Sequence, residues 1–269
     1  VKLLTYHLGR DLPELNIIRT IRIPWYNKLA PGPSIHKLYV DILVLLKAVS
    51  LMVTFKPDII HAHLHEGAFI GLFLKKMFGV PLAFDFQGSL VYELVDHGLS
   101  KTSFFARWVI ALENFINRSV DIIYTSSNNA KRLMIDQFNV REEKVINVPD
   151  GIDLDRKVTR SQELREQLTL KPDEKIVLYM GTLNQLEGAD LLIPICQKVV
   201  ESYPRVKFVI IGYPNVQVYQ QKAEECGLSD FIVFTGRVNH EETFEYLGIS
   251  DVAISPKRSA TEGNLKLCY

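Results

Sequence analysis

Short apolar runs alternate with longer amphipathic stretches along nearly the whole chain, and this alternation constrains the fold more than any other feature. Several runs, such as 175–181 and 206–212, are continuously β-branched or aromatic rather than alternating in polarity. Continuous runs of this kind are typical of parallel strands that are covered on both faces. Because parallel neighbours require a crossover connection, usually a helix, the pattern predicts a doubly wound α/β fold.

The expected elements fall into two sets. In the first half, strands are expected at 1–6, 16–24, 58–63, 81–87, 121–126 and 144–148, with helices near 34–55, 67–78, 101–118 and 127–138. In the second half, strands are expected at 175–181, 206–212, 232–236 and 251–255, with helices at 161–168, 189–202 and 215–226. Two successive strand and helix sets predict two Rossmann-like domains.

A change in composition marks the seam between the two sets. Pro149-Asp150-Gly151 is a turn signal, and the stretch 153–173 after it is charged and weakly apolar. We therefore predict one domain over 1–155 and a second over 156–269, with the carboxyl ends of both sheets facing one cleft. The chain starts at Val1 inside a strand pattern and ends inside a helical one. We expect truncation at both ends, with a first strand missing and an incomplete second domain.

The composition of the chain limits its expected binding partners and its expected cellular compartment. Lys and Arg total 31, as do Asp and Glu, so the formal net charge is zero and nucleic acid is not an expected partner. The three cysteines are too widely spaced for a zinc pattern or a disulfide framework, which suits a cytoplasmic protein. The most apolar stretch, 42–55, is short and broken by Lys47, which predicts a buried helix rather than a membrane span. Peripheral contact with the inner face of a membrane stays open.

Three histidines alternate where the strand at 58–63 ends. His61, His63 and His65 would share one face of an extended chain and so offer metal ligands. No carboxylate or cysteine cluster accompanies them in the sequence, so we expect no metal site. The favoured interpretation is that His61 packs in the interior, while His63, His65 and Glu66 line the mouth of the cleft on the acceptor side.

The next strand ends in a second polar group. Asp85 and Gln87 would project from one face near the strand end, where a carboxylate can act as a base or bind a sugar hydroxyl. An equally weighted alternative is that Asp85 only caps a loop. Gly88 allows a ligand to approach the backbone closely.

Two loops of the second half are candidates for binding phosphate. The loop 181–188 has Gly181 and Gly188 at its ends and can present backbone amides, although it is neither a dinucleotide fingerprint nor a P-loop. In the loop 256–264, Lys257 and Arg258 can face a diphosphate just before an expected helix start. The alternative for this second loop is a solvated, charged segment with a capping box.

Seven stretches, in their order along the chain, carry a family resemblance. They are 57–63, 121–127, 148–153, 179–183, 208–212, 234–238, and 250–256 followed by Glu262-Gly263. With these stretches the chain resembles family 4 glycosyltransferases, retaining enzymes of the GT-B architecture. The resemblance implies transfer of a sugar from a nucleotide-diphosphate donor, bound mainly by the second domain, to an acceptor bound by the first.

The resemblance also implies roles for particular residues. Glu262 matches a glutamate that contacts the donor sugar. The expected donor-binding residues are Gly181, Thr182, Lys257, Arg258, Glu262, Gly263 and Asn264. The expected catalytic residues are Glu262, Asp85 and Gln87, and those on the acceptor side are His63, His65, Glu66 and Gly88.

Three positions depart from the family pattern. Thr182 and Glu187 stand where the family usually has an arginine and a lysine on the diphosphate, and Gln87 stands where it often has a histidine. A carboxylate at position 187 would repel a diphosphate, and glutamine carries no proton at neutral pH. We therefore expect Lys257, Arg258 and helix amides to supply the charge stabilisation.

The expected activity is that of a retaining, metal-independent glycosyltransferase with no cofactor beyond its nucleotide-sugar donor. The acceptor, whether glycan, lipid or small molecule, is left open, and the chain by itself is expected to be inactive. A non-catalytic sugar-nucleotide-binding or scaffold protein of the same fold is the alternative, motivated by the three departures. An NAD-dependent enzyme is disfavoured because no glycine fingerprint follows an expected strand, and an epimerase remains a third hypothesis.

Overall fold

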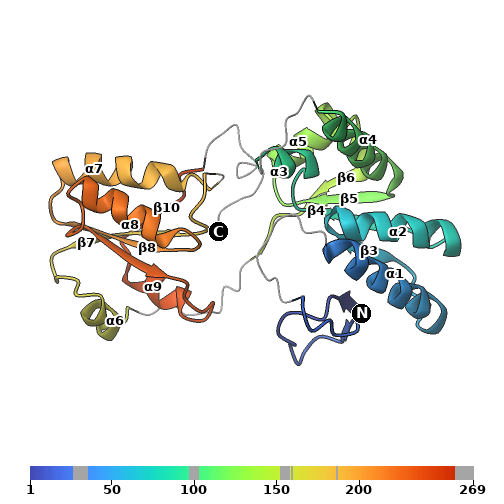
Figure 1. Cartoon of the computed structure of the whole chain (residues 1–269), viewed down its shortest axis with the longest axis horizontal. Helices are drawn as coiled ribbons and strands as arrows, with labels where there is room; N and C mark the ends of the chain where they lie inside the picture. The colour runs from blue at the N-terminus through green and yellow to red at the C-terminus, as the bar shows by residue number, and fades with distance from the viewer. Residues whose placement is uncertain (27–35, 97–102, 152–157, 159, 186, 258–269) are drawn as a thin grey trace. The chain divides into compact units, whose positions relative to one another are not determined.

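The computed structural model describes the chain except for residues 27–35, 97–102, 152–157, 159, 186 and 258–269. The chain divides into two compact units, one formed by Val1–Asp150 and a second that begins at Gly151 (Figure 1). Among the described residues, no helix combines the length and the apolar content needed to cross a bilayer.

The first unit is built on a four-stranded parallel sheet in the order β3-β4-β5-β6. Its strands are β3 (Ile60–His63), β4 (Leu82–Phe86), β5 (Ile122–Thr125) and β6 (Val145–Asn147). Its helices are α1 (His36–Thr54), α2 (Leu64–Phe78), α3 (Leu90–Asp96), α4 (Phe104–Ser119), α5 (Asn128–Asp136) and the 3-10 turn Glu142–Lys144. Two further strands, β1 (Leu3–Thr5) and β2 (Ile17–Arg19), form a separate parallel pair.

The strands of this sheet follow one another in sequence, and right-handed crossovers then place successive helices on the same face. The core on that face includes the buried residues Leu82, Phe84, Phe86, Ile116, Ile123 and Met134. Helix α2 packs closely against the sheet, since a Cβ at Gly71 would lie 2.6 Å from Leu82 Cδ1. The alternation of β4 turns Asp85 to the opposite face of the sheet.

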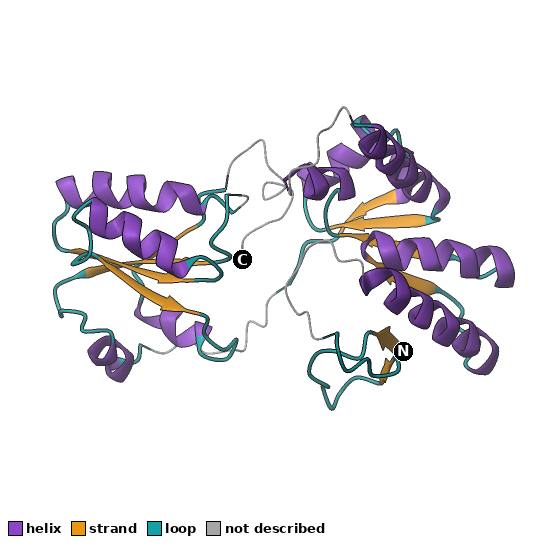
Figure 2. Ribbon diagram, in the orientation of Figure 1, coloured by secondary structure: helices purple, strands orange, loops and turns teal. Residues whose placement is uncertain are grey.

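The second unit is doubly wound around a sheet in the order β10-β7-β8-β9, with all strands parallel. Its strands are β7 (Lys175–Met180), β8 (Val206–Ile211), β9 (Ile232–Gly236) and β10 (Val252–Ile254). Its helices are α6 (Gln162–Gln167), α7 (Leu192–Ser202), preceded by the 3-10 turn Ala189–Leu191, α8 (Val216–Glu225) and α9 (Thr243–Ile249). Helices α7 and α8 cover one face of the sheet, and α6 and α9 cover the other (Figures 1 and 2).

The α/β fold with two Rossmann-like parallel sheets is confirmed, and every expected strand contains an observed one. Two helices, α3 and α9, were not expected. Each has seven residues, or about two turns, which gives helical periodicity little length in which to show, although the six-residue α6 was expected. Helix α2 begins at Leu64, three residues before its expected start at residue 67, and this changes the placement of His65.

Candidate functional site

His61, His63 and Asp85 come together at the carboxyl ends of β3 and β4. The parallel register pairs His63 with Asp85, and His63 Nδ1 lies 2.8 Å from Asp85 Oδ2. The ring of His61 stacks on that of His63 with 4.7 Å between centroids, and Tyr124 of β5 meets His61 edge-on. Burial is the main cause that lowers the pKa of His61, and neighbouring His63 lowers it further against the opposing effect of Asp85.

The structure corrects one expectation at this cluster and decides against one alternative. His61 was expected to pack in the interior, but it is exposed, because the pleat of β3 turns Ala62 rather than His61 toward the core. Asp85 does not cap a loop. It lies within β4 and pairs across the sheet with His63.

The turn from β3 into α2 separates His63 from His65. Leu64 adopts a φ of 60°, in the left-handed region, which costs a non-glycine residue about 1–2 kcal/mol. The chain changes there from strand to helix, so His63 stays on the sheet face and His65 enters the first turn of α2. The three histidines therefore do not share one face, as a continued strand would require.

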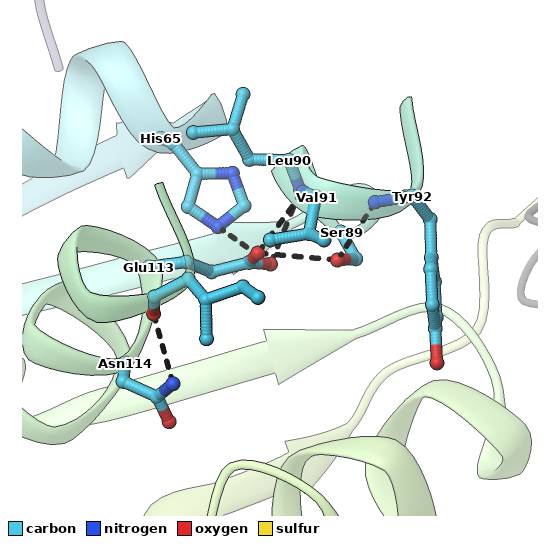
Figure 3. Close-up of polar contacts among 8 residues, drawn as sticks. His65, Ser89, Leu90, Val91, Tyr92, Glu113 and Asn114 are labelled. Carbon is cyan, nitrogen blue, oxygen red and sulfur yellow. Dashed lines mark hydrogen bonds and ion pairs between the residues drawn. The ribbon is translucent and has the colours of Figure 1, made fainter. Parts of the chain in front are cut away.

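His65 lies in the interior and not at the mouth of a cleft, so that expectation is wrong. The residue is 7% exposed, and its ring makes edge contacts with Phe84 and Phe86. Its Nε2 lies 3.4 Å from Oε1 of Glu113, as Figure 3 shows. A buried imidazole among aromatic rings and beside a carboxylate can orient neighbouring groups, but it is not available to a ligand from solvent.

Glu113 of α4 is fully buried and organises the segment that follows β4. Its carboxylate accepts hydrogen bonds from Ser89 Oγ at 3.2 Å and from the backbone amides of Leu90 and Val91 at 3.1 Å each (Figure 3). These contacts fix the start of α3 and the end of the loop that contains Gln87. A carboxylate without exposure is stable only when it is satisfied in this way.

Sequence analysis did not identify Glu113, because a glutamate on an amphipathic helix is ordinarily assigned to the solvated face. A signal was nevertheless available in the helical spacing. Glu113 falls in line with Ala106, Val109 and Ile116, three apolar residues that α4 buries. A charged residue on the apolar stripe of a helix indicates a buried polar contact.

The remaining acceptor-side candidates lie around the start of α2 and the loop after β4. Gln87 and Gly88 are both half-buried in that loop. Glu66 is also half-buried, and Lys37 Nζ donates a hydrogen bond to it at 2.7 Å. Burial raises the pKa of Glu66, but the hydrogen bond from Lys37, a backbone hydrogen bond and the charges of Lys37 and His65 together lower the net pKa.

In the second unit, the loops that follow β7 and β10 lie side by side because these strands are neighbours in the sheet. Gly188 has a φ of +72°, and a Cβ there would lie 2.0 Å from the carbonyl oxygen of Pro256. Lys257 Nζ lies 3.1 Å from Glu187 Oε2, with side chains that are 16% and 28% exposed. The carboxylate that was expected to repel a diphosphate is thus already paired with a cation.

Hydrogen bonds between its own residues also stabilise the loop after β7. Tyr179 donates a hydrogen bond from its hydroxyl to the carbonyl of Thr182 at 2.9 Å, and the Thr182 hydroxyl accepts one from Asn184 at 3.2 Å. Gly181 and Thr182 are half-buried at the end of β7. The other donor-side candidates, Arg258, Glu262, Gly263 and Asn264, lie outside the described residues.

Comparison with protein families assigns each half of the chain. Residues 1–156 match the model described as Glycosyltransferase Family 4, and residues 160–264 match that described as Glycosyl transferases group 1. The chain belongs to the family 4 glycosyltransferases. The resemblance that the sequence motifs indicated is therefore confirmed.

Relatives of this family 4 glycosyltransferase chain are distant in sequence but extend over most of it. Alpha-monoglucosyldiacylglycerol synthase of Streptococcus pneumoniae is 23% identical over 227 residues, which are 81% of this chain and 50% of the relative. The chain spans 64%, 50% and 49% of the lengths of three curated relatives that it matches.

Solved structures share the fold. Sucrose-phosphate synthase of Thermosynechococcus elongatus superposes with a TM-score of 0.70 at 18% identity, over 93% of this chain and 61% of that one. HepE of Anabaena, solved in complex with UDP and glucose, has a TM-score of 0.63 at 17% identity, over 90% of this chain and 61% of that one. At these identities the likeness establishes the GT-B fold of this glycosyltransferase family member and nothing finer.

Proposed function

We propose that this protein transfers a sugar from a nucleotide-diphosphate donor to an acceptor, with retention of the anomeric configuration. The observation that carries the proposal is the match of the two halves of the chain, in order, to two glycosyltransferase family models. The curated relatives carry the names of transferases and synthases, which favours catalysis over a non-catalytic scaffold.

On the donor side, the proposal uses the adjoining loops after β7 and β10. The backbone amide of Thr182 would contact the diphosphate beside Gly181, whose own amide donates to the carbonyl of Ile211. The ammonium of Lys257 would balance the charge of the diphosphate. Binding of UDP by HepE, at 17% identity, makes a uridine nucleotide the first donor to test. Arg258, Glu262, Gly263 and Asn264 complete the proposed donor site, with Glu262 orienting the donor sugar. No metal ion or cofactor is proposed for the transfer step.

On the acceptor side, the proposal uses the half-exposed polar groups near the end of β4. The carboxylate of Asp85, held by His63, can accept a hydrogen bond from an acceptor hydroxyl. Gln87 and Gly88, both half-buried, follow it in the loop after β4 and would offer an amide side chain and a backbone without a Cβ, and Glu66 lies in the first turn of α2. His65 is left out of the acceptor site because it is buried. The acceptor class stays open among glycans, lipids and small molecules, and the proposed location is the cytoplasm or the inner face of its membrane.

The proposal is tested by thermal-shift measurements on the full-length protein with UDP-, GDP-, ADP- and dTDP-sugars. Stabilisation by one donor class, reduced in Lys257→Ala and Glu262→Ala but retained in Lys198→Ala, is the expected result. Lys198 is an exposed lysine of α7 and controls for the loss of a surface charge. Anomeric coupling constants of the product by NMR then test retention. Absence of any shift with a folded full-length protein would reject the donor assignment.

A further inference from the structure

We propose that His61, His63 and Asp85 form a binding site for a divalent transition-metal ion of the zinc class. Each residue offers one ligand atom, and these atoms all lie within 4.8 Å of one another. Two imidazole nitrogens and one carboxylate oxygen are a common ligand set for zinc, which then keeps a fourth position for water or another oxygen ligand. The proposal does not rest on glycosyl transfer.

The strand geometry places the ligands. His61 and His63 are two residues apart on β3, so their side chains leave the same face of the sheet. Asp85 reaches that face from β4, directly opposite His63 in the register. A strand pair with buried Ala62 and Phe84 beneath it fixes the backbone of all three ligands, which reduces the ordering cost of binding an ion.

The distances fit an ion with little rearrangement. Tetrahedral zinc with bonds of 2.0–2.2 Å holds its ligand atoms about 3.3 Å apart. His63 Nδ1 and Asp85 Oδ2 lie 2.8 Å apart, and no pair in the group exceeds 4.8 Å, so the required spacing falls between these values. We expect rotations about the side-chain bonds, with the backbone fixed, to bring the three atoms around one ion.

The surroundings leave the site accessible. His61 and His63 are exposed, with 56% of the His63 side chain open to solvent. Tyr124 of β5 packs edge-on against His61 and limits the rotation of that ring. An ion can therefore enter from solvent and bind to three side chains that already lie close together.

The sequence alone argued against this site because no cluster of carboxylates or cysteines accompanied the histidines. Asp85 follows His63 by 22 positions, and the parallel register of β3 and β4 brings the two side chains together. His65, which had been grouped with the other two histidines, is not a ligand, because it is buried on α2. The competing interpretation is a simple His63–Asp85 contact with His61 stacked beside it, which would need no metal.

The experiment measures binding of Zn²⁺ by isothermal titration calorimetry to the full chain after EDTA treatment and tag removal, with Co²⁺ absorption as a report of ligand geometry. The variants are His61→Ala, His63→Ala and Asp85→Asn, and the control is His240→Ala, another exposed histidine. Circular dichroism establishes that each variant is folded.

One Zn²⁺ per chain is expected, with affinity reduced at least about tenfold in each of the three site variants and unchanged in the control. Co²⁺ should give the intense visible absorption of a four-coordinate site, lost in the same variants. The proposal is overturned by a wild-type chain that binds no Zn²⁺ at tens of micromolar, by site variants that bind like the wild type, or by an equal loss in His240→Ala.

Discussion

Oδ2 of Asp251 accepts a hydrogen bond from the backbone amide of Ile176 at 2.8 Å. The amide of Asp251 in turn donates to the carbonyl of Ile176 at 2.9 Å, so one aspartate satisfies both backbone groups of Ile176 where β10 begins to pair with β7. Asp121 makes the same two contacts with Leu82 in the first unit, at 2.8 Å and 3.0 Å. An aspartate placed just before an apolar strand therefore fixes where that strand joins its neighbour in both sheets.

Asp251→Asn should destabilise the second unit by about 1–2 kcal/mol at neutral pH, because a charge-assisted hydrogen bond becomes a neutral one. The hydrogen bond from the amide of Ile176 is the main cause that lowers the pKa of Asp251 in the folded protein, and the hydrogen bond and charge of Lys175 lower it further against the opposing effect of burial. A depressed folded pKa stabilises the protein above the unfolded value of about 3.9, and this stability is lost as pH falls through the folded pKa. Urea unfolding between pH 7 and pH 2 should show a weaker acid dependence in the variant.

Asp121→Asn should act in the same direction but less strongly, since 43% of the Asp121 side chain is exposed against 22% for Asp251. Burial raises the pKa of Asp121, but the hydrogen bond from Leu82 and the charge of Lys75 outweigh it. Asp230→Asn, at an exposed position, is the control. An equal loss of stability in the control would mean that net charge, and not the strand contact, is responsible.

Glu113→Ala should cost about 3 kcal/mol or more, since it leaves buried donors on Ser89, Leu90 and Val91 without their acceptor. Glu113→Gln should cost about 2 kcal/mol, although it keeps the shape, because both carboxylate oxygens accept from donors and one would become an NH₂ group. Chemical denaturation measures both losses. Hydrogen exchange should show faster exchange at the amides of Leu90 and Val91.

A matched control for this pair of variants is Glu143→Gln, which removes the same charge from an exposed side chain. Its stability should stay within about 0.5 kcal/mol of the wild type. If Glu113→Gln is equally neutral, the buried carboxylate does not hold the start of α3.

Gly188→Ala should destabilise the second unit more than Gly227→Ala. Both glycines have a positive φ, +72° and +68°, so both substitutions carry the backbone strain of about 1 kcal/mol expected for alanine there. A Cβ at Gly188 would also meet the Pro256 carbonyl oxygen at 2.0 Å, whereas nothing lies within 4 Å of one at Gly227. The melting temperatures of the two variants separate the backbone strain, which both share, from the steric clash with Pro256, which only Gly188→Ala has. Equal melting temperatures would show that the loops after β7 and β10 move apart without cost.

Glu187→Gln should strengthen UDP binding by the full-length protein about threefold to tenfold, because it removes a negative charge beside Lys257 from the proposed diphosphate site. Lys257→Ala should weaken binding about tenfold, since it removes the cation itself. Titration calorimetry at two salt concentrations measures both effects, and Glu224→Gln, at an exposed position on α8, is the control. Weaker binding in Glu187→Gln would mean that the carboxylate positions the ammonium rather than opposing the ligand.

The sequence by itself determined the elements and their faces. The apolar runs at 175–181 and 206–212 placed β7 and β8, and the alternation of Phe84, Asp85 and Phe86 turned the carboxylate away from the core. The position of an element and the direction of its side chains depend on the two-residue period of a strand or the 3.6-residue period of a helix. Residues close together in the sequence are enough to show either period. The seven-residue helices α3 and α9 were missed because about two turns show this period only weakly, although the six-residue α6 was expected.

Only the tertiary structure decided which side chains meet. Asp85 contacts His63 because of the register between two strands, and Glu113 reaches Ser89 across 24 positions because α4 packs over the end of β4. His65 is an interior residue because α2 begins at Leu64, the residue before it, rather than at the expected residue 67. Local periodicity fixes the direction in which a side chain leaves its element, but the partner that it meets is set by strand register and helix packing between distant segments.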